Sequence, residues 1–191
     1  MDYIITALVS YLFGSIPFGY LFTKILLKKD IRNVGSGNIG ATNVLRTGNK
    51  SLGYLTLVLD IAKAVVPVIY IKFNYPDLVY ISALCAFLGH LFPIWLNFKG
   101  GKGVATFVGI LISINIYYAL IFGTVWILTF LISKYSSLSS LFASISIPFY
   151  LYIIDQGNII FFIIMFVLIF YTHRENIKRL INKEETKSKI Y

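Results

Sequence analysis

Long apolar runs dominate this sequence and restrict the folds open to it. Several, beginning with residues 3–26, reach the roughly 20 residues that an α-helix needs to cross the hydrocarbon core of a bilayer. Only 13% of the residues are charged, against roughly 25% in soluble domains. Because backbone groups in lipid must be bonded within the protein, we predict an all-α integral membrane protein. The first run follows an acidic residue and lacks a clear cleavage site, so we expect it to be retained.

The lengths of the runs predict about seven transmembrane helices, over residues 3–26, 52–71, 78–98, two within 104–132, 138–154 and 158–172. Pro76 is expected to separate the second helix from the third. The run from Val104 to Ile132 is too long for one span, and we divide it near Ser113 to Asn115 into two short or tilted helices. Since no repeat or soluble second domain is visible, we expect a single bundle over residues 1–191.

The basic residues are placed asymmetrically along the predicted spans. Of 17 Lys and Arg residues, 15 fall in connections or ends on one side, while Lys63 lies within a span and Lys72 on the other side. By the positive-inside tendency this side is cytoplasmic, so the N-terminus lies outside and the C-terminus inside. The net charge of +9 therefore indicates topology and not a nucleic-acid partner.

The stretch NVGSGNIGATNVLR, residues 33–46, contains the G-x-G-x-x-G spacing of a dinucleotide-binding loop. Such a loop requires a preceding buried strand, whereas here a membrane span precedes it. The acid expected on the ribose is Asp60, which lies inside the next apolar run. We therefore reject the dinucleotide interpretation.

The same stretch has the composition of a phosphate cradle. Glycines permit left-handed conformations in which backbone N–H groups converge on an anion. The alternative is a flexible polar loop between two spans. The candidate binding residues are Gly35, Ser36, Gly37, Asn38, Gly40, Thr42, Asn43 and Arg46, the last able to bind phosphate through two hydrogen bonds.

Two further polar stretches lie on the same predicted side. NFKGGKGVAT, residues 97–106, places Gly100, Gly101, Lys102 and Gly103 at a helix start, which predicts an anion site, or alternatively only topology anchors. THRENIKR, residues 172–179, follows the last span. We expect His173 and Asn176 to share a helix face and Glu175 to pair with Arg179, the alternative being an amphipathic interfacial end. Together the three stretches predict a binding site for an anionic ligand.

Ionisable residues within the apolar runs are few. Asp60 and Lys63 are three residues apart and share a helix face, which favours a structural ion pair over a lining of a substrate channel. His90 is expected to be a satisfied buried histidine, and Cys85 a small buried hydrophobe. With two histidines and no clustered acids, we predict no metal site and no cofactor.

The segments GSIPFGYL, VGSGNIGATNVLR, GHLFPIWLNFKGGKGVAT and HRENIKRL resemble the acylphosphate-dependent glycerol-3-phosphate acyltransferases, the PlsY family of bacterial membrane enzymes. The resemblance covers nearly the whole chain. It implies acyl transfer from acyl phosphate to the 1-hydroxyl of glycerol 3-phosphate, giving lysophosphatidic acid and phosphate at the cytoplasmic face of the inner membrane. A soluble enzyme that makes acyl phosphate is a further candidate partner.

The resemblance also implies roles for individual residues. The catalytic residues would be Ser36, Arg46, Lys102, His173 and Asn176, with Glu175 holding the local structure. Ser140 would bind substrate, although the stretch SSLSS offers several serines. Because acyl phosphate is a mixed anhydride with a good leaving group, no covalent acyl-enzyme is required.

Other functions fit the sequence less well. The His-x4-Asp motif typical of CoA-dependent acyltransferases is absent. The position where it requires Asp is Trp95 after His90 and Lys178 after His173. A CDP-alcohol phosphotransferase would need acid-rich helices. A transporter of phosphorylated solutes is the alternative from another class, but the connections expected outside the cell are short and poor in cations.

Overall fold

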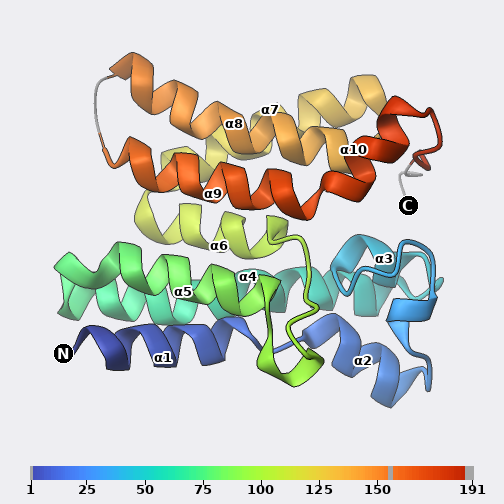
Figure 1. Ribbon diagram of the computed structural model, residues 1–191, viewed down its shortest axis with the longest axis horizontal. Helices are drawn as coiled ribbons and strands as arrows, with labels where there is room; N and C mark the ends of the chain where they lie inside the picture. Colours follow the sequence, from blue (N-terminus) through green and yellow to red (C-terminus); the bar gives the residue numbers. More distant parts are fainter. Residues whose placement is uncertain (1, 155–156, 188–191) are drawn as a thin grey trace. The chain divides into compact units, whose positions relative to one another are not determined.

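The computed structural model describes residues 2–154 and 157–187, and the regular elements in these ranges are all helical (Figure 1). The chain divides into two compact units, unit 1 up to Ile114 and unit 2 from Asn115. Unit 1 contains α1 (Tyr3–Gly14), α2 (Phe18–Leu26), η1 (Ile31–Asn33), α3 (Ala41–Leu45), α4 (Lys50–Asn74), η2 (Pro76–Leu78), α5 (Val79–Leu91), η3 (Ile94–Leu96) and α6 (Val104–Ile114). Unit 2 contains α7 (Ile116–Ser133), α8 (Ser136–Ile154), α9 (Ile159–Thr172) and α10 (Arg174–Ile181). The predicted all-α fold is confirmed, whereas the single domain stays a prediction.

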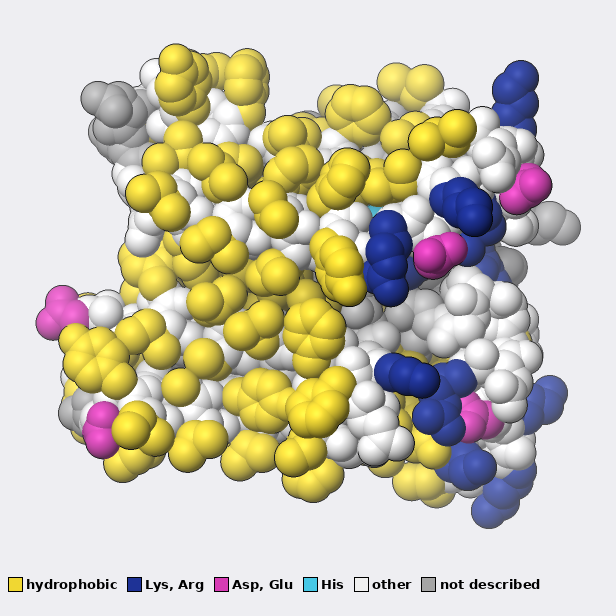
Figure 2. Space-filling view, viewed as in Figure 1, with side chains coloured by type: hydrophobic (Ala, Val, Ile, Leu, Met, Phe, Trp, Pro, Cys, Tyr) yellow, Lys and Arg dark blue, Asp and Glu magenta, His cyan; other side chains and the backbone are white. Residues whose placement is uncertain are grey.

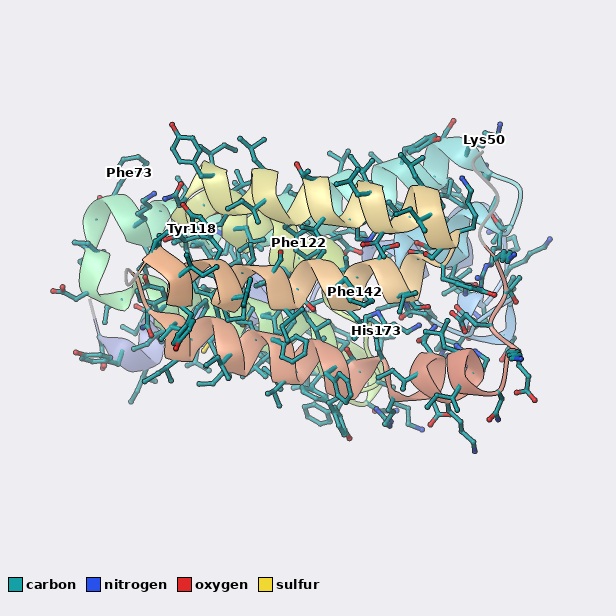
Figure 3. All side chains as sticks on the ribbon, turned by 90° about the horizontal axis from the view of Figure 1, so that it is seen from above. Lys50, Phe73, Tyr118, Phe122, Phe142 and His173 are labelled. Atoms are coloured by element: carbon teal, nitrogen blue, oxygen red, sulfur yellow. The ribbon has the colours of Figure 1, made fainter. Side chains whose placement is uncertain are left out.

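Helix α4 is the centre of unit 1 and contacts α1, α2, α3, α5 and α6. Figure 3 labels Lys50 and Phe73 near its two ends. Small residues allow the neighbouring helices to approach closely, as is usual in membrane bundles. A Cβ added at Gly109 of α6 would overlap the carbonyl of Ile61 in α4, and one at Gly14 of α1 would overlap the backbone of Ala86 in α5.

The first apolar run forms the span predicted over residues 3–26, but the helix within it is broken. Pro17 lacks an N–H and separates α1 from α2, leaving polar backbone groups between them. Two side chains from other helices form hydrogen bonds with residues of this break. Lys63 Nζ of α4 donates to the Ile16 carbonyl at 2.8 Å, and Trp95 Nε1 donates to Ser15 Oγ at 2.8 Å.

The other predicted boundaries agree with the structure. α6 ends at Ile114 and α7 begins at Ile116, with Asn115 Oδ1 accepting from the Tyr117 N–H at 3.0 Å, so the division of the fourth long run is confirmed. The break at Pro76 is also confirmed, because α4 ends two residues before it. Five helical segments in the described ranges are long and apolar enough to cross a membrane. α6 has 11 residues and spans only about 16 Å. The number of seven crossings therefore stays a prediction.

Unit 2 is a hairpin-like array in which α8 packs on both α7 and α9. α10 turns away from α9 by 60° at His173, which Figure 3 shows at this junction. Phe122 is the only buried residue of α7, as expected for a helix that faces lipid. α10 instead carries mostly charged and polar residues.

Apolar and basic surfaces are separated within each unit. Figure 2 shows hydrophobic side chains covering the flanks of the long helices, while Lys and Arg gather at one end of each unit. In unit 1 the basic end includes the connection from α2 to α3, and in unit 2 it includes α10. Lys72 is an exception, since its Nζ donates to the Ser113 and Ile114 carbonyls at 2.8 and 2.9 Å and caps α6. The predicted orientation in the membrane stays a prediction.

Candidate phosphate-binding site

The first glycine segment, residues 33–46, follows the short turn η1, which begins after Asp30. The Asp30 carboxylate accepts from the Arg32 N–H at 3.0 Å and pairs with its guanidinium at 2.6 Å. The hydrogen bond from Arg32 lowers the pKa of Asp30 to about 2. Gly35 and Gly37 then take φ angles of 55° and 72°, left-handed conformations that glycine adopts without strain. The predicted left-handed conformation is thus present at these two glycines but not at Gly40, which is extended with a φ of −78°.

The loop is held from inside by Asn43, whose side chain is buried. Its Oδ1 accepts from the Ser36 N–H at 3.0 Å, and its Nδ2 lies 3.2, 2.8 and 2.8 Å from the carbonyls of Ile31, Val34 and Asn38. A backbone amide bonded to Asn43 is unavailable to a ligand. The structure thus gives Asn43 a role in shaping the loop, whereas its predicted direct contact with phosphate stays a prediction.

The polar groups on the outside of this loop are accessible. Ser36 and Thr42 are exposed, and Arg46 is half-buried. The Arg46 side chain folds back along the loop, because a Cβ added at Gly35 would lie 3.0 Å from Arg46 Cδ and 3.6 Å from its Nη1. In the described ranges no carboxylate lies within salt-bridge distance of Arg46. Its positive charge is therefore not neutralised by a neighbouring acid.

The second glycine segment, residues 97–103, is held in a different way. The Gly100 and Gly101 N–H groups donate to the carbonyls of Leu91 and His90, both at 3.0 Å. Added Cβ atoms would overlap the His90 carbonyl at Gly100 and the His90 ring at Gly101. Gly103 has a φ of 86° and its Cβ would overlap the Phe87 ring.

This arrangement differs from the anion site predicted for the second segment, because the amides of residues 97–101 already have backbone acceptors. The glycines instead let the chain pass over the end of α5 and bring Lys102 to the start of α6. Phosphate binding by Gly100, Gly101 and Gly103 stays a prediction.

The two glycine segments meet in unit 1 through apolar packing. A buried cluster joins Ile31, Ile39 and Val44 beside or within the first segment to Leu96, which directly precedes the second. Leu52 of α4 completes this cluster. The structure therefore brings the segments that carry Arg46 and Lys102 to the same end of unit 1.

Two predicted residues lie close together in unit 2, at the turn from α9 to α10. His173 is buried, and its Nδ1 lies 2.9 Å from the Ile169 carbonyl, which can only accept. Nδ1 therefore carries a proton, so the lone pair of the neutral ring is on Nε2. Asn176 is also buried, and its Nδ2 donates to Glu185 Oε1 at 2.7 Å.

Glu185 is a residue that the sequence analysis missed. Its carboxylate also accepts from Ser137 Oγ at 2.9 Å and from Arg179 Nε at 2.7 Å. Burial raises the pKa of Glu185, but these hydrogen bonds from Arg179, Asn176 and Ser137 outweigh burial and lower the pKa below its ordinary value of 4.5. No sequence periodicity connects residue 185 to residue 137, so the only signal was an acid near basic and amide side chains.

The expected pairing of Glu175 with Arg179 is wrong, because Arg179 bonds Glu185 and Glu175 is exposed. The structural role predicted for Glu175 stays a prediction. Ser140 is buried, donates to the Ser136 carbonyl at 2.8 Å and accepts from Trp126 Nε1 at 3.1 Å. These bonds fix its hydroxyl in the packing of α7 on α8, and its contact with substrate stays a prediction.

The predicted ion pair between Asp60 and Lys63 is confirmed, with Lys63 Nζ 2.7 Å from Asp60 Oδ1 and both side chains almost fully buried. His90 is buried as expected, but the expectation that its ring is satisfied is wrong, because its Nδ1 has no hydrogen-bond partner in the described ranges and lies 3.9 Å from the same carboxylate oxygen. Residues 2–154 and 157–187 contain no group of three or more His, Cys, Asp or Glu that could hold a metal ion.

Comparison with known proteins connects this arrangement to an enzyme family. The family model described as glycerol-3-phosphate acyltransferase matches residues 4–183. The chain belongs to this family. A glycerol-3-phosphate acyltransferase of Pelagibacter ubique is 72% identical over the full length of both chains, and one of Brucella anthropi is 49% identical over 96% of this chain and 92% of its own.

Solved structures extend the comparison to the fold. The crystal structure of PlsY (YgiH), an integral membrane glycerol 3-phosphate acyltransferase in its glycerol 3-phosphate form, matches with a TM-score of 0.90 and 37% identity, covering 97% of this chain and 94% of that one. Its lysophosphatidic acid form matches with a TM-score of 0.87 and 36% identity, with the same coverage. The enzyme is therefore a membrane acyltransferase of the PlsY type.

Proposed function

We propose that the enzyme transfers an acyl chain from acyl phosphate to the 1-hydroxyl of sn-glycerol 3-phosphate. The family and the two ligand forms of its crystallised relative support glycerol 3-phosphate as acceptor and lysophosphatidic acid as product. The observation that carries the proposal is the pair of glycine segments at one end of unit 1, one carrying Arg46 without a carboxylate partner in the described ranges and the other carrying Lys102. Cations on shaped loops suit substrates that both contain phosphate.

The reaction needs one nucleophilic displacement. The substrate hydroxyl attacks the acyl carbonyl carbon, a C–O bond forms, and the bond from the carbonyl carbon to the phosphate oxygen breaks to release inorganic phosphate. Arg46 and Lys102 are assigned to the phosphates, where positive charge stabilises the charge that develops on the leaving group. Ser36 is assigned to the same end as a hydrogen-bond donor. Since phosphate leaves readily, positioning and charge suffice without a covalent acyl-enzyme.

The hydroxyl proton requires an acceptor. We assign this role to His173, because Nδ1 donates to the Ile169 carbonyl and Nε2 is therefore the nitrogen that can act as a base in the neutral ring. Asn176 is assigned to substrate positioning. The phosphate of the substrate is the competing proton acceptor, and the pH profile of a His173→Gln variant distinguishes the two.

The central test uses the purified protein in detergent with glycerol 3-phosphate and palmitoyl phosphate, without metal or nucleotide. Phosphate and lysophosphatidic acid should appear in equal amounts. Acyl-CoA and acyl carrier protein donors are run in parallel. Product from either of these but none from acyl phosphate would refute the proposed donor, and no product from any donor would direct attention to transport.

We also propose that the active site faces the cytoplasm, as the distribution of Lys and Arg indicates. A cysteine introduced at Lys187, in a variant with Cys85 replaced by Ala, should react with an impermeant thiol reagent only in inside-out bacterial membrane vesicles. Reaction in right-side-out vesicles would reverse the topology. A soluble enzyme that produces acyl phosphate would then meet the basic side of this protein.

A further inference from the structure

The second glycine segment lies against the end of α5, where His90 contacts it through both its carbonyl and its ring. The His90 carbonyl accepts from the Gly101 N–H at 3.0 Å. A Cβ at Gly100 would overlap that carbonyl, and a Cβ at Gly101 would overlap the imidazole at Nε2. Lys102 is the next residue along the chain. A shift of the His90 backbone or ring would therefore displace the segment that carries Lys102.

His90 faces the buried ion pair on its other side. Its Nδ1 is buried without a hydrogen-bond partner in the described ranges and lies 3.9 Å from Asp60 Oδ1, the oxygen that pairs with Lys63 Nζ. This distance is too long for a direct hydrogen bond, but the two atoms are a matched donor and acceptor that a small closure or one bridging water can join. Leaving the buried Nδ1 unpaired would be costly, and Asp60 Oδ1 can accept a second hydrogen bond beside the one from Lys63, so this pairing is the expected arrangement.

Lys63 connects the same cluster to the broken helix. Its Nζ pairs with Asp60 at 2.7 Å and donates to the Ile16 carbonyl at 2.8 Å. The buried cluster of Asp60, Lys63 and His90 thus joins the break between α1 and α2, the middle of α4 and the end of α5. Burying charges within a membrane helix is unfavourable, and such groups usually have a functional consequence.

We propose that Asp60 and His90 are positioning residues for Lys102. Asp60 holds the imidazole through Nδ1, the imidazole and the His90 carbonyl support Gly100 and Gly101, and this support sets where the Lys102 ammonium meets a phosphate. This inference rests on the proposed role of Lys102 and gives the buried ion pair a function beyond stability. Neither residue is assigned contact with substrate.

A double-mutant cycle tests the proposal, with radiolabelled glycerol 3-phosphate so that slow variants remain measurable. His90→Asn should lower kcat/KM about tenfold, mainly by raising KM for a phosphate-bearing substrate, since coupled neighbours show effects of this order. In a Lys102→Ala background the same change should lower kcat/KM by less than about threefold, because the group being positioned is gone. Equal factors in both backgrounds would overturn the proposal.

Ser82→Ala is the matched structural control. Ser82 is buried on α5, and its Oγ lies 2.8 Å from Ser10 Oγ of α1. This variant should lower the melting temperature but leave KM unchanged in either background. If His90→Asn fails to fold, Gly101→Ala displaces the ring from the other side while the ion pair stays intact, and its effect should likewise shrink in the Lys102→Ala background. An undiminished effect there would contradict the proposal.

A binding measurement separates this proposal from the proposed donor. Glycerol 3-phosphate should raise the melting temperature of the wild-type protein, and the increase should be smaller in Asp60→Asn. If palmitoyl phosphate supports no transfer but this difference is observed, the donor is wrong and the positioning role stands. An equal increase in both proteins would overturn the positioning role.

Discussion

The two glycine segments of unit 1 share a residue type but use it for different physical purposes. In the first segment, Gly35 and Gly37 supply left-handed turns, and one buried side chain, Asn43, satisfies the backbone inside the loop. In the second, Gly100 and Gly101 supply the absence of a side chain, so that the backbone can lie against His90. A glycine-rich loop is therefore not one kind of structure, and substitutions should affect the two segments in different ways.

The largest expected effect concerns what the segments have in common, one cation each. Arg46→Ala and Lys102→Ala should each lower kcat by about 10²–10³-fold with the fold retained, since a preorganised charge at developing negative charge contributes at this level. Steady-state kinetics measures kcat, and a thermal melt measures whether the fold is retained.

Arg32→Ala and Lys99→Ala are the matched controls, because both are exposed cations on or beside the same segments. Each should change kcat by less than about twofold. Losses as large as those of Arg46→Ala and Lys102→Ala would mean that net charge, and not the two specific residues, accounts for activity.

Asn43→Ala should affect the first glycine segment and not the second, because the two segments are held in place by different contacts. The substitution removes the acceptor for the Ser36 N–H and the donor to three carbonyls, which should destabilise the protein by about 1–3 kcal/mol. Because only the first segment depends on this residue, proteolysis should increase between residues 33 and 46 and not between 97 and 103. Equal cleavage in both segments would contradict their independence.

Gly101→Ala tests the close packing of the second glycine segment on His90, and Gly48→Ala is its control. A Cβ at Gly101 overlaps the His90 ring, and overpacking of this kind typically costs about 1–3 kcal/mol. Gly48 has a φ of 88° and no heavy atom within 4 Å of an added Cβ, so only the left-handed conformation is penalised, by about 1–2 kcal/mol. Gly101→Ala should also raise KM, whereas Gly48→Ala should not. A raised KM in both variants would remove the special role of the contact with His90.

The smallest expected effect is electrostatic and belongs to the first segment alone. Asp30 has a folded pKa of about 2, below its ordinary value of 3.8, because of the hydrogen bond from Arg32. A lowered pKa means that the contribution to stability is present above pH 3.8 and lost as the pH falls toward 2. The melting temperature of Asp30→Asn should be slightly below that of wild type at pH 6 and equal to it near pH 2. Since the pair is exposed, the difference should be small. A difference that grows as the pH falls would reverse this sign.

The sequence predicted most of the local structure correctly because local rules govern it. Apolar run lengths gave the membrane helices, Asn115 and Pro76 marked helix ends, and the three-residue spacing of Asp60 and Lys63 gave their ion pair. The span over residues 3–26 is present, but its break at Pro17 was not predicted, because proline is tolerated in membrane helices when other groups bond the freed carbonyls. Here Lys63 bonds the Ile16 carbonyl and Trp95 bonds the Ser15 hydroxyl, and both residues lie far along the chain.

The candidate site likewise has features that the sequence determined and features that only the tertiary structure decided. The sequence by itself determined that this is a membrane protein with cations and glycines gathered in three polar stretches, because hydropathy and residue type act at each position separately. Only the tertiary structure decided that Asn43 shapes its own loop, that Gly101 lies on His90, and that Arg179 pairs with Glu185 and not with Glu175. These contacts depend on the path of the backbone between distant positions, and no periodic pattern in the sequence encodes that path.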